Sequence, residues 1–258
     1  MITGSEPEEM FGPTSFVPPL RHAVREQIAW LNLVKLAGRP VPMPLPGEAV
    51  PVLLIPGLGA GDYSLIPLAR ALRRQGHPTH ASGMRANVGC TTELAAQMER
   101  RAEQIADRHR RPIAIVGHSR GGTLAKLVAA SRPDLVENIV ALATPNLNPF
   151  AAAPWVLLTV EQLAALNRRG VRGVLGDDCI RGTCHREVAA RLAAPLSDHI
   201  GYTSIYSRRD GVVDWRACLD RDAHHIEVTT SHIGMAASRR VQRTVASQLA
   251  MPHRAPRE

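Results

Sequence analysis

The chain has 258 residues, of which 45% are hydrophobic and 21% charged, so it can bury the core of one sizeable domain and is not a disordered polymer. The formal net charge of +8 comes almost wholly from scattered arginines without interleaved aromatic residues, a pattern that argues against a nucleic-acid partner. The acidic start MITGSEPEEM lacks the features of a signal peptide, and no stretch approaches the roughly 20 apolar residues of a transmembrane segment, so we expect a cytoplasmic protein.

Residues 1–49 are predicted to form a helix and a proline-rich arm ahead of the main domain. The helical pattern ends at Gly38, with Pro40 beyond, and its apolar stripe consists of Leu20, Val24, Ile28 and Leu31. Such a short stripe usually shields the body of a protein, although it could also lie on a partner or a membrane. The segment PVPMPLPG then alternates proline with other residues, which predicts an extended arm.

From Val50 onward, buried strands alternate with helices. Apolar runs in VPVLLIPG, PTHASG, IAIV and VENIVALATP predict strands, and the segments between them predict helices over about 63–74, over about 91–108 and from Ser119 to Pro133. Apolar runs that alternate with helices indicate a mostly parallel sheet covered on both faces, the doubly wound α/β class. We therefore expect one domain over residues 50–258.

The alternation breaks between residues 146 and 197. Two helical patterns, APWVLLTVEQLAALNRRG and CHREVAARLAAPL, follow each other there without an intervening strand. This arrangement predicts an insertion above the sheet that acts as a lid. The alternation resumes with strands in IGYTSIYS and HHIEVTT and ends with a helix from about Met235 to Leu249.

A serine follows the apolar strand in IAIVGHSRGGTLAKL. The glycines at positions 117 and 121, two residues before and after Ser119, permit an abrupt turn from the strand into the next helix. Such a turn exposes the serine above the sheet. Because an alcohol is a weak nucleophile at neutral pH, Ser119 would need a base, an orienting carboxylate and donors for the developing oxyanion.

Candidates for these roles must follow strands, because the carboxyl ends of parallel strands meet at the edge where Ser119 lies. His232 ends the run IEVTTSHIGM and is the predicted general base. Asp210 directly follows SIYSRR and is the predicted orienting acid, with Asp214 as its rival. Asp214 is next to Trp215, where it could instead cap a short helical turn. His118 flanks the serine and is expected to point away from it in a packing or hydrogen-bonding role.

Backbone N–H groups are the expected oxyanion donors. One belongs to Arg120, the residue after the serine, and the other to Leu58 in the turn IPGLGAGD after the first strand. That glycine-rich turn could instead cradle a phosphate, but it lacks the lysine and the serine or threonine of a nucleotide-binding loop.

Together, VLLIPGLGAGD, GHSRGG, YSRRDGVVDW and SHIGM resemble the α/β-hydrolase superfamily, most closely its bacterial esterase and lipase-like members, over residues 50–249. The resemblance implies Ser119 as nucleophile, Asp210 as acid and His232 as base, with the amides of Leu58 and Arg120 as the oxyanion hole. It also implies a helical cap where the insertion falls. The sheet begins at VLLIP without the family's first antiparallel strands, and the arginine at 120 could either favour an anionic or polar acyl group or pair with a carboxylate elsewhere.

The leading functional hypothesis is hydrolysis of a small carboxylic ester through an acyl-serine intermediate, without a metal or another cofactor. The alternatives are acyl transfer or thioester hydrolysis by the same triad, and a non-catalytic binding protein of the same fold. The low aromatic content, 3%, favours an aliphatic pocket. The sequence does not indicate an oligomeric state.

The four cysteines contain no paired C-x-x-C, so they form no zinc pattern, and reduced thiols are expected in a cytoplasmic chain. Cys179 and Cys184 fall in the predicted lid, whereas Cys218 comes just after the acid loop. A disulfide between the lid and the body through Cys218 is therefore geometrically conceivable.

Overall fold

The computed structural model describes residues 16–36 and 49–250. The proline-rich arm and the predicted helix end at Gly38 lie outside these residues. Within them, no helix is both long enough and apolar enough to cross a bilayer.

A six-stranded sheet forms the centre of the domain, with the strand order β2-β1-β3-β4-β5-β6. Every neighbouring pair is parallel, as the sequence predicts. The inner strands are continuously apolar because helices cover both of their faces. The strands are β1 Val52–Ile55, β2 Thr79–Ala81, β3 Ile113–His118, β4 Val136–Leu142, β5 Gly201–Tyr206 and β6 His224–Glu227.

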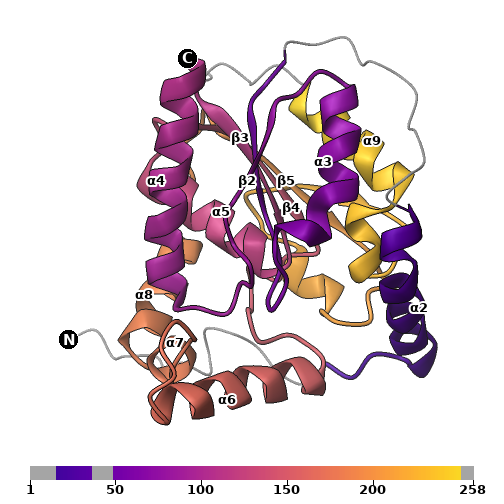
Figure 1. The fold of residues 1–258 in the computed structure, drawn as a ribbon, viewed down its shortest axis with the longest axis vertical. Coiled ribbons are helices and arrows are strands. Elements are labelled where there is room, and N and C mark those ends of the chain that lie inside the picture. Colours follow the sequence, from indigo (N-terminus) through magenta and orange to yellow (C-terminus); the bar gives the residue numbers. More distant parts are fainter. Residues whose placement is uncertain (1–15, 37–48, 251–258) are drawn as a thin grey trace.

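Two hydrophobic layers flank the sheet. Alternate side chains of β1 point to opposite faces, so Leu53 joins one cluster and Leu54 the other. The first face is covered by α4 (Thr91–His109), α5 (Arg120–Ser131) and α8 (Thr183–Ala193). The second face is covered by α3 (Ile66–Arg74) and α9 (Arg239–Leu249), which lie on the other side in Figure 1. The doubly wound α/β class predicted from the sequence is therefore confirmed.

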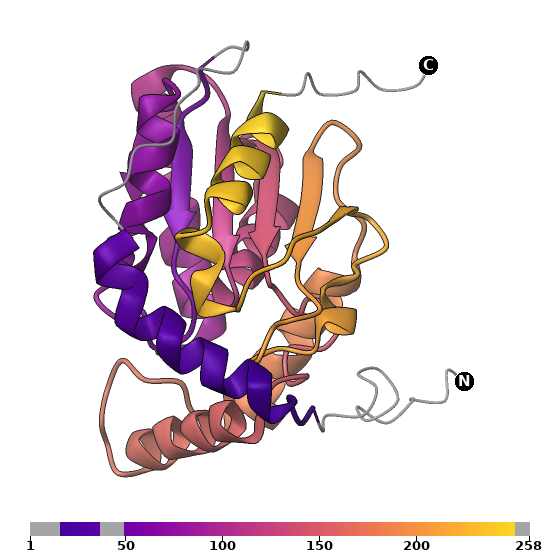
Figure 2. The same ribbon diagram turned by 90° about the vertical axis from the view of Figure 1, so that its right-hand side faces the viewer.

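Three helices occupy the segment where the alternation breaks. These are α6 (Pro154–Arg168), the short α7 (Asp178–Arg181) and α8, so the two predicted helices are present with one additional turn. Helix α6 lies beyond the carboxyl ends of the strands (Figures 1 and 2). Helix α6 therefore stands over the edge of the sheet where the candidate residues gather, whereas α8 packs against α4 and α5 on the first face.

The last predicted helix, Met235 to Leu249, is interrupted in the structure. A 3-10 helix, η3 (Ile233–Ala236), comes first, and α9 starts afresh after Ser238. The Ser238 side chain accepts a hydrogen bond from the Val241 amide, a helix N-cap that divides the segment. Two further 3-10 helices, η1 (Asp62–Leu65) and η2 (Trp215–Cys218), follow β1 and β5.

Helix α2 (Leu20–Leu36) forms as predicted but presents a different face to the domain. The side chains of Leu20, Val24 and Ile28 are 81%, 49% and 53% exposed, whereas His22 and Glu26 are buried. The expectation that the apolar stripe shields the body is therefore wrong for these three residues. The helix is bound to the domain through the buried carboxylate of Glu26, which accepts hydrogen bonds from backbone amides. In this orientation the apolar side chains of Leu20, Val24 and Ile28 face outward.

Candidate active site

Ser119 sits in a strained turn between β3 and α5. Its φ of +53° lies in the left-handed region, which a residue with a side chain rarely adopts. Neither Gly117 nor Gly121 is left-handed, but a Cβ at Gly117 would overlap the Gly121 carbonyl, and one at Gly121 would overlap the Ile55 carbonyl. The two glycines therefore serve close backbone packing, and the turn itself is the one predicted from the sequence.

His232 and Asp210 form a buried hydrogen-bonded pair. The Nδ1 atom of His232 is 2.8 Å from Oδ2 of Asp210, and the two residues are 5% and 3% exposed. The second carboxylate oxygen, Oδ1, accepts hydrogen bonds from the amides of Val212 and Val213, each at 2.8 Å. The carboxylate is thus fixed on both oxygens and aimed at the imidazole ring.

The rival acid has a different position. Oδ1 of Asp214 accepts a hydrogen bond from the Arg216 amide at 3.0 Å and caps η2, the helical turn expected there. The structure therefore brings Asp210, and not Asp214, to His232.

The environment of His232 favours its charged form. Burial by itself lowers the pKa of His232, but the nearby Asp210 carboxylate, its hydrogen bond and the Glu26 carboxylate together raise that pKa above its ordinary value. A base with a raised pKa holds an abstracted proton more firmly. The bond from Nδ1 to Asp210 leaves Nε2 as the nitrogen available to a substrate or nucleophile.

His118 supports the same loop and does not take part in the pair. Its Nε2 atom lies 3.0 Å from the carbonyl oxygen of His232, which can only accept, so Nε2 carries a proton. Burial and the neighbouring His232 lower the pKa of His118 to about 3, so the ring is neutral. The hydrogen-bonding role expected from the sequence is confirmed.

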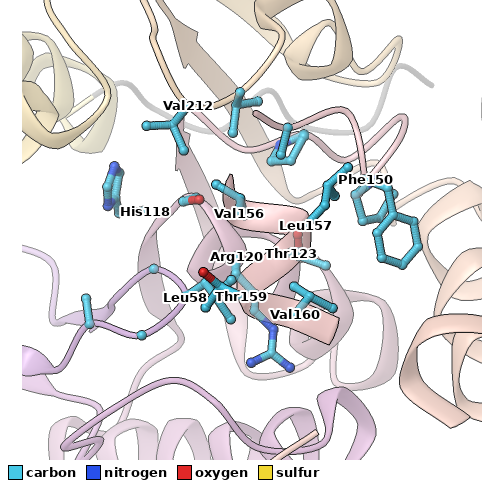
Figure 3. A pocket seen from close by; sticks show the side chains of 18 of the residues that line it. Leu58, His118, Arg120, Thr123, Phe150, Val156, Leu157, Thr159, Val160 and Val212 are labelled. Carbon is cyan, nitrogen blue, oxygen red and sulfur yellow. The ribbon is translucent and has the colours of Figure 1, made fainter. Parts of the chain in front are cut away.

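Ser119 and His232 line one cavity of about 500 Å³, a volume typical of small-molecule sites. Leu58 and Arg120, the predicted oxyanion donors, line it as well (Figure 3). Neither of their backbone N–H groups donates to an acceptor within the described part of the chain. Both amides are therefore available to an oxygen atom bound beside Ser119.

The far wall of the cavity comes from the segment over the sheet edge. Helix α6 contributes Val156, Leu157 and Val160, some of them visible in Figure 3, and α7 contributes Ile180. The composition predicted an aliphatic pocket, and this prediction is wrong, because three aromatic residues also line the cavity: Tyr63, Phe150 and Trp155. An apolar group of a ligand would find an apolar lining here.

The sequence over residues 50–184 matches the family model described as alpha/beta hydrolase fold, which covers more than half of the chain. The protein belongs to the α/β-hydrolase family. A search of curated proteins finds no match.

Solved structures of similar fold include several hydrolases, all at low identity. The mature Bacillus licheniformis lipase BlEst2 is 15% identical with a TM-score of 0.59, and the alignment covers 83% of this chain and 96% of that one. The carboxylesterase CesB of Bacillus subtilis is 14% identical with a TM-score of 0.51 (89% and 98% covered). An extracellular α/β-hydrolase of a Paenibacillus species is 15% identical with a TM-score of 0.50 (80% and 100% covered). At such identity the likeness demonstrates the shared fold.

In this α/β-hydrolase, Glu26 is a site residue that the sequence analysis did not identify. Its Oε1 atom accepts hydrogen bonds from the amides of Gly211 and His232, at 3.0 and 2.7 Å, and Oε2 accepts one from Ile233 at 2.9 Å. One buried carboxylate thus joins the acid loop to the base loop. Its only sequence signal was a charge within an amphipathic helix, far from any strand end.

Gly211 permits this contact. A Cβ there would come within 2.8 Å of the His22 carbonyl oxygen and 3.0 Å of the Glu26 side chain. Gly211 is not left-handed, so the absence of a side chain there matters for the close approach of α2 and not for backbone conformation.

The Arg120 side chain turns away from His118 (Figure 3) and binds the loop before α4. Its Nη1 donates to Oδ1 and the carbonyl of Asn87, at 2.7 and 3.2 Å, and Nη2 donates to the Gly89 carbonyl and the Thr91 hydroxyl, at 2.7 and 2.9 Å. Within the described residues no carboxylate pairs with it, so the alternative of a carboxylate partner is wrong. The guanidinium group instead holds the loop of Asn87, whose backbone pairs with the Leu58 turn.

The four cysteines are all free thiols in the structure. Cys218 is buried in a small cluster with Val212 and Val213 and forms no disulfide with Cys179 or Cys184. The disulfide conceived for Cys218 is therefore not found. The other three cysteines, Cys90, Cys179 and Cys184, lie close to one another.

Proposed function

We propose that this α/β-hydrolase cleaves carboxylic esters, with Ser119 as nucleophile, His232 as general base and Asp210 as the group that orients the base. The observation that carries this proposal is that a serine on a strained turn and a buried Asp210–His232 pair line one cavity. Together they are the parts that acyl transfer to serine requires.

In the proposed reaction, His232 Nε2 accepts the Ser119 hydroxyl proton while Oγ attacks the ester carbonyl carbon. The carbonyl oxygen gains the negative charge, and the free amides of Leu58 and Arg120 stabilise it. The carbon–oxygen bond then breaks as His232 returns the proton to the leaving alcohol. A water molecule, deprotonated by His232, then attacks the acyl carbon, and His232 returns that proton to Ser119 Oγ as the bond to serine breaks and the acid is released.

We further propose that residues 146–197 act as a lid that selects the acyl group. The apolar side chains of α6 and α7 line the cavity opposite the serine turn, where an alkyl chain would be removed from water. Shortening α6 should change the preference among esters of graded chain length while acetate esters are still cleaved.

The test is a burst of p-nitrophenol from a short-chain p-nitrophenyl ester, together with labelling by a fluorophosphonate probe. Ser119→Ala should abolish both the burst and the label. Ser64→Ala is the matched control, because Ser64 also lines the cavity but its hydroxyl donates to the Gly61 carbonyl. Folded wild-type protein that takes no label would exclude the proposal and favour a non-catalytic binding role.

Acyl transfer and thioester hydrolysis use the same triad and are separated by competition. Added alcohols should not outcompete water for the acyl-serine, and thioesters should not outcompete oxygen esters for the free Ser119. If they do, the triad assignment stands and the reaction class changes.

A further inference from the structure

Three cysteines from two distant parts of the chain meet beside the cavity. Cys90 precedes α4, Cys179 lies in α7 and Cys184 in α8. The Sγ atom of Cys184 is 3.7 Å from that of Cys90 and 3.5 Å from that of Cys179, and all three sulfur atoms lie within 4.8 Å of one another. Cys184 is buried and the other two are partly buried, so the cluster is enclosed but reachable from solvent.

These separations are close to those of a thiolate metal site. Zinc binds cysteine sulfur at about 2.3 Å in a tetrahedron, which places neighbouring sulfurs about 3.8 Å apart. The two short sulfur–sulfur distances here are near this edge length without rearrangement of the backbone. The Thr92 hydroxyl oxygen lies 3.2 Å from Cys90 Sγ and 3.6 Å from Cys184 Sγ, so it can donate a hydrogen bond to a thiolate of the site. Water would fill the fourth position of the tetrahedron.

The surrounding charge is also suitable for zinc. The Arg120 guanidinium interacts electrostatically with all three cysteines and, within the described residues, has only neutral oxygens as hydrogen-bond partners. Three thiolates and one Zn²⁺ carry a net charge of −1, which this arginine would balance. A monovalent ion such as Cu⁺ would leave an excess negative charge, so the charge balance favours zinc.

We propose that Cys90, Cys179 and Cys184 bind a structural zinc ion that joins α7 and α8 to the start of α4. The thiol protons leave to solvent as the three sulfur–zinc bonds form, and no electron transfer takes place. The ion would link α7 and α8 to the loop before α4, to which the Arg120 guanidinium donates its hydrogen bonds. The spacing rule for zinc motifs did not find this site, because only the fold brings Cys90 to the other two cysteines.

The experiment uses full-length protein that is reduced, freed of metal and then titrated with Co²⁺, a spectroscopic substitute for zinc, and separately with Zn²⁺. Wild-type protein should develop thiolate-to-cobalt charge-transfer absorption and retain about one zinc ion per chain after gel filtration. Cys184→Ser should weaken zinc binding by at least about 100-fold, given that even indirect partners of a metal contribute 10- to 100-fold.

Cys218→Ala is the matched control, because this cysteine is buried outside the cluster, and it should bind zinc like the wild type. Cys179→Ser is a second cluster variant in case Cys184→Ser does not fold. The proposal is overturned if reduced, folded wild-type protein retains no zinc, or if the folded cluster variants bind it as tightly as the control. It is also overturned if two of the three thiols reoxidise to a disulfide in the presence of zinc. None of these readouts depends on esterase activity.

Discussion

The two sides of the proposed active site, the serine turn and the loops of the proposed acid and base, are held in place by different means. On the nucleophile side, the conformation of Ser119 is fixed by backbone packing among neighbours, with Gly121 pressed against the end of β1. On the base side, the loops of Asp210 and His232 are joined by Glu26, a side chain from a helix at the other end of the chain. The backbone packing around Ser119 depends on glycines close to it in sequence, so a short motif can predict it. The contacts of Glu26 join residues far apart in sequence, so no short motif predicts them.

The difference is also electrostatic. Among the residues that the structure describes, no charged side chain hydrogen-bonds to the serine turn, and Arg120 directs its guanidinium to Asn87 and the adjoining loop. The base loop surrounds two buried carboxylates, both of which raise the pKa of His232. We therefore expect substitutions on the serine side to act through packing, and substitutions on the base side to act through charge and position.

The largest expected effect is on the base side. Asp210→Asn should lower kcat by about 10⁴-fold, by analogy with loss of the triad acid in serine proteases, because an amide cannot stabilise the imidazolium form of His232. Asp214→Asn should retain activity and lose about 1 kcal/mol of unfolding free energy, the usual contribution of a helix cap. Ester kinetics and urea unfolding of both variants measure this. An inactive Asp214→Asn beside an active Asp210→Asn would reverse the assignment.

Glu26→Ala tests whether a distant carboxylate positions the base. It leaves three N–H groups without their acceptor, and a base displaced by about 1 Å can lose about 10²-fold in rate, so we expect kcat to fall by about this factor. Val24→Ala is the control, because Val24 is in the same helix but is half exposed; it should change stability by less than about 0.5 kcal/mol. Equal kcat values in the two variants would show that α2 contributes nothing to positioning.

Alanine substitutions at Gly121 and Gly211 test how tightly the backbone is packed at the serine turn and at the loop of Asp210. Gly121→Ala forces a methyl group into the Ile55 carbonyl at the sheet, so it should cost at least about 1–3 kcal/mol of unfolding free energy. Gly211→Ala meets His22 and Glu26 of α2, a peripheral helix that can move outward. It should therefore cost less stability but lower kcat/KM. Denaturant midpoints and ester kinetics of both variants check the contrast, which fails if Gly211→Ala is the less stable protein.

The smallest expected effect is a shift in pH dependence. A general base must be neutral, so kcat/KM should fall as the pH drops through the raised pKa of His232, above the ordinary value of about 6.5. Glu26→Gln removes one charge that raises this pKa, so the acidic limb of the profile should move to lower pH. The same profile for Val24→Ala should coincide with that of the wild type. An acidic limb that does not move would mean that Glu26 has no electrostatic role.

The sequence predicted the strands, the helices on both faces and the turn at Ser119, because each depends on periodicity or on glycines a few residues away. It also distinguished Asp210 from Asp214 by their distance from the strand end, and the structure places both as predicted. It did not predict the outward face of α2 or the Glu26 contacts. The three hydrogen bonds of the buried Glu26 carboxylate, and not burial of the apolar stripe, decide which face of α2 meets the domain. The groups that Glu26 binds are backbone amides, which every residue except proline has, so the sequence does not mark them.

The contacts of Glu26 also have a consequence for the order of events during synthesis. The Glu26 carboxylate is synthesised long before the amides that it binds, which are 185, 206 and 207 positions later. Contacts of such long sequence separation form late in folding, because a large loop must close before they can contribute. A nascent chain could therefore form most of its sheet, including the turn at Ser119, before the loop of His232 is held in position by Glu26. In the proposed mechanism, catalytic competence therefore comes only after α2 has met the loops of Asp210 and His232.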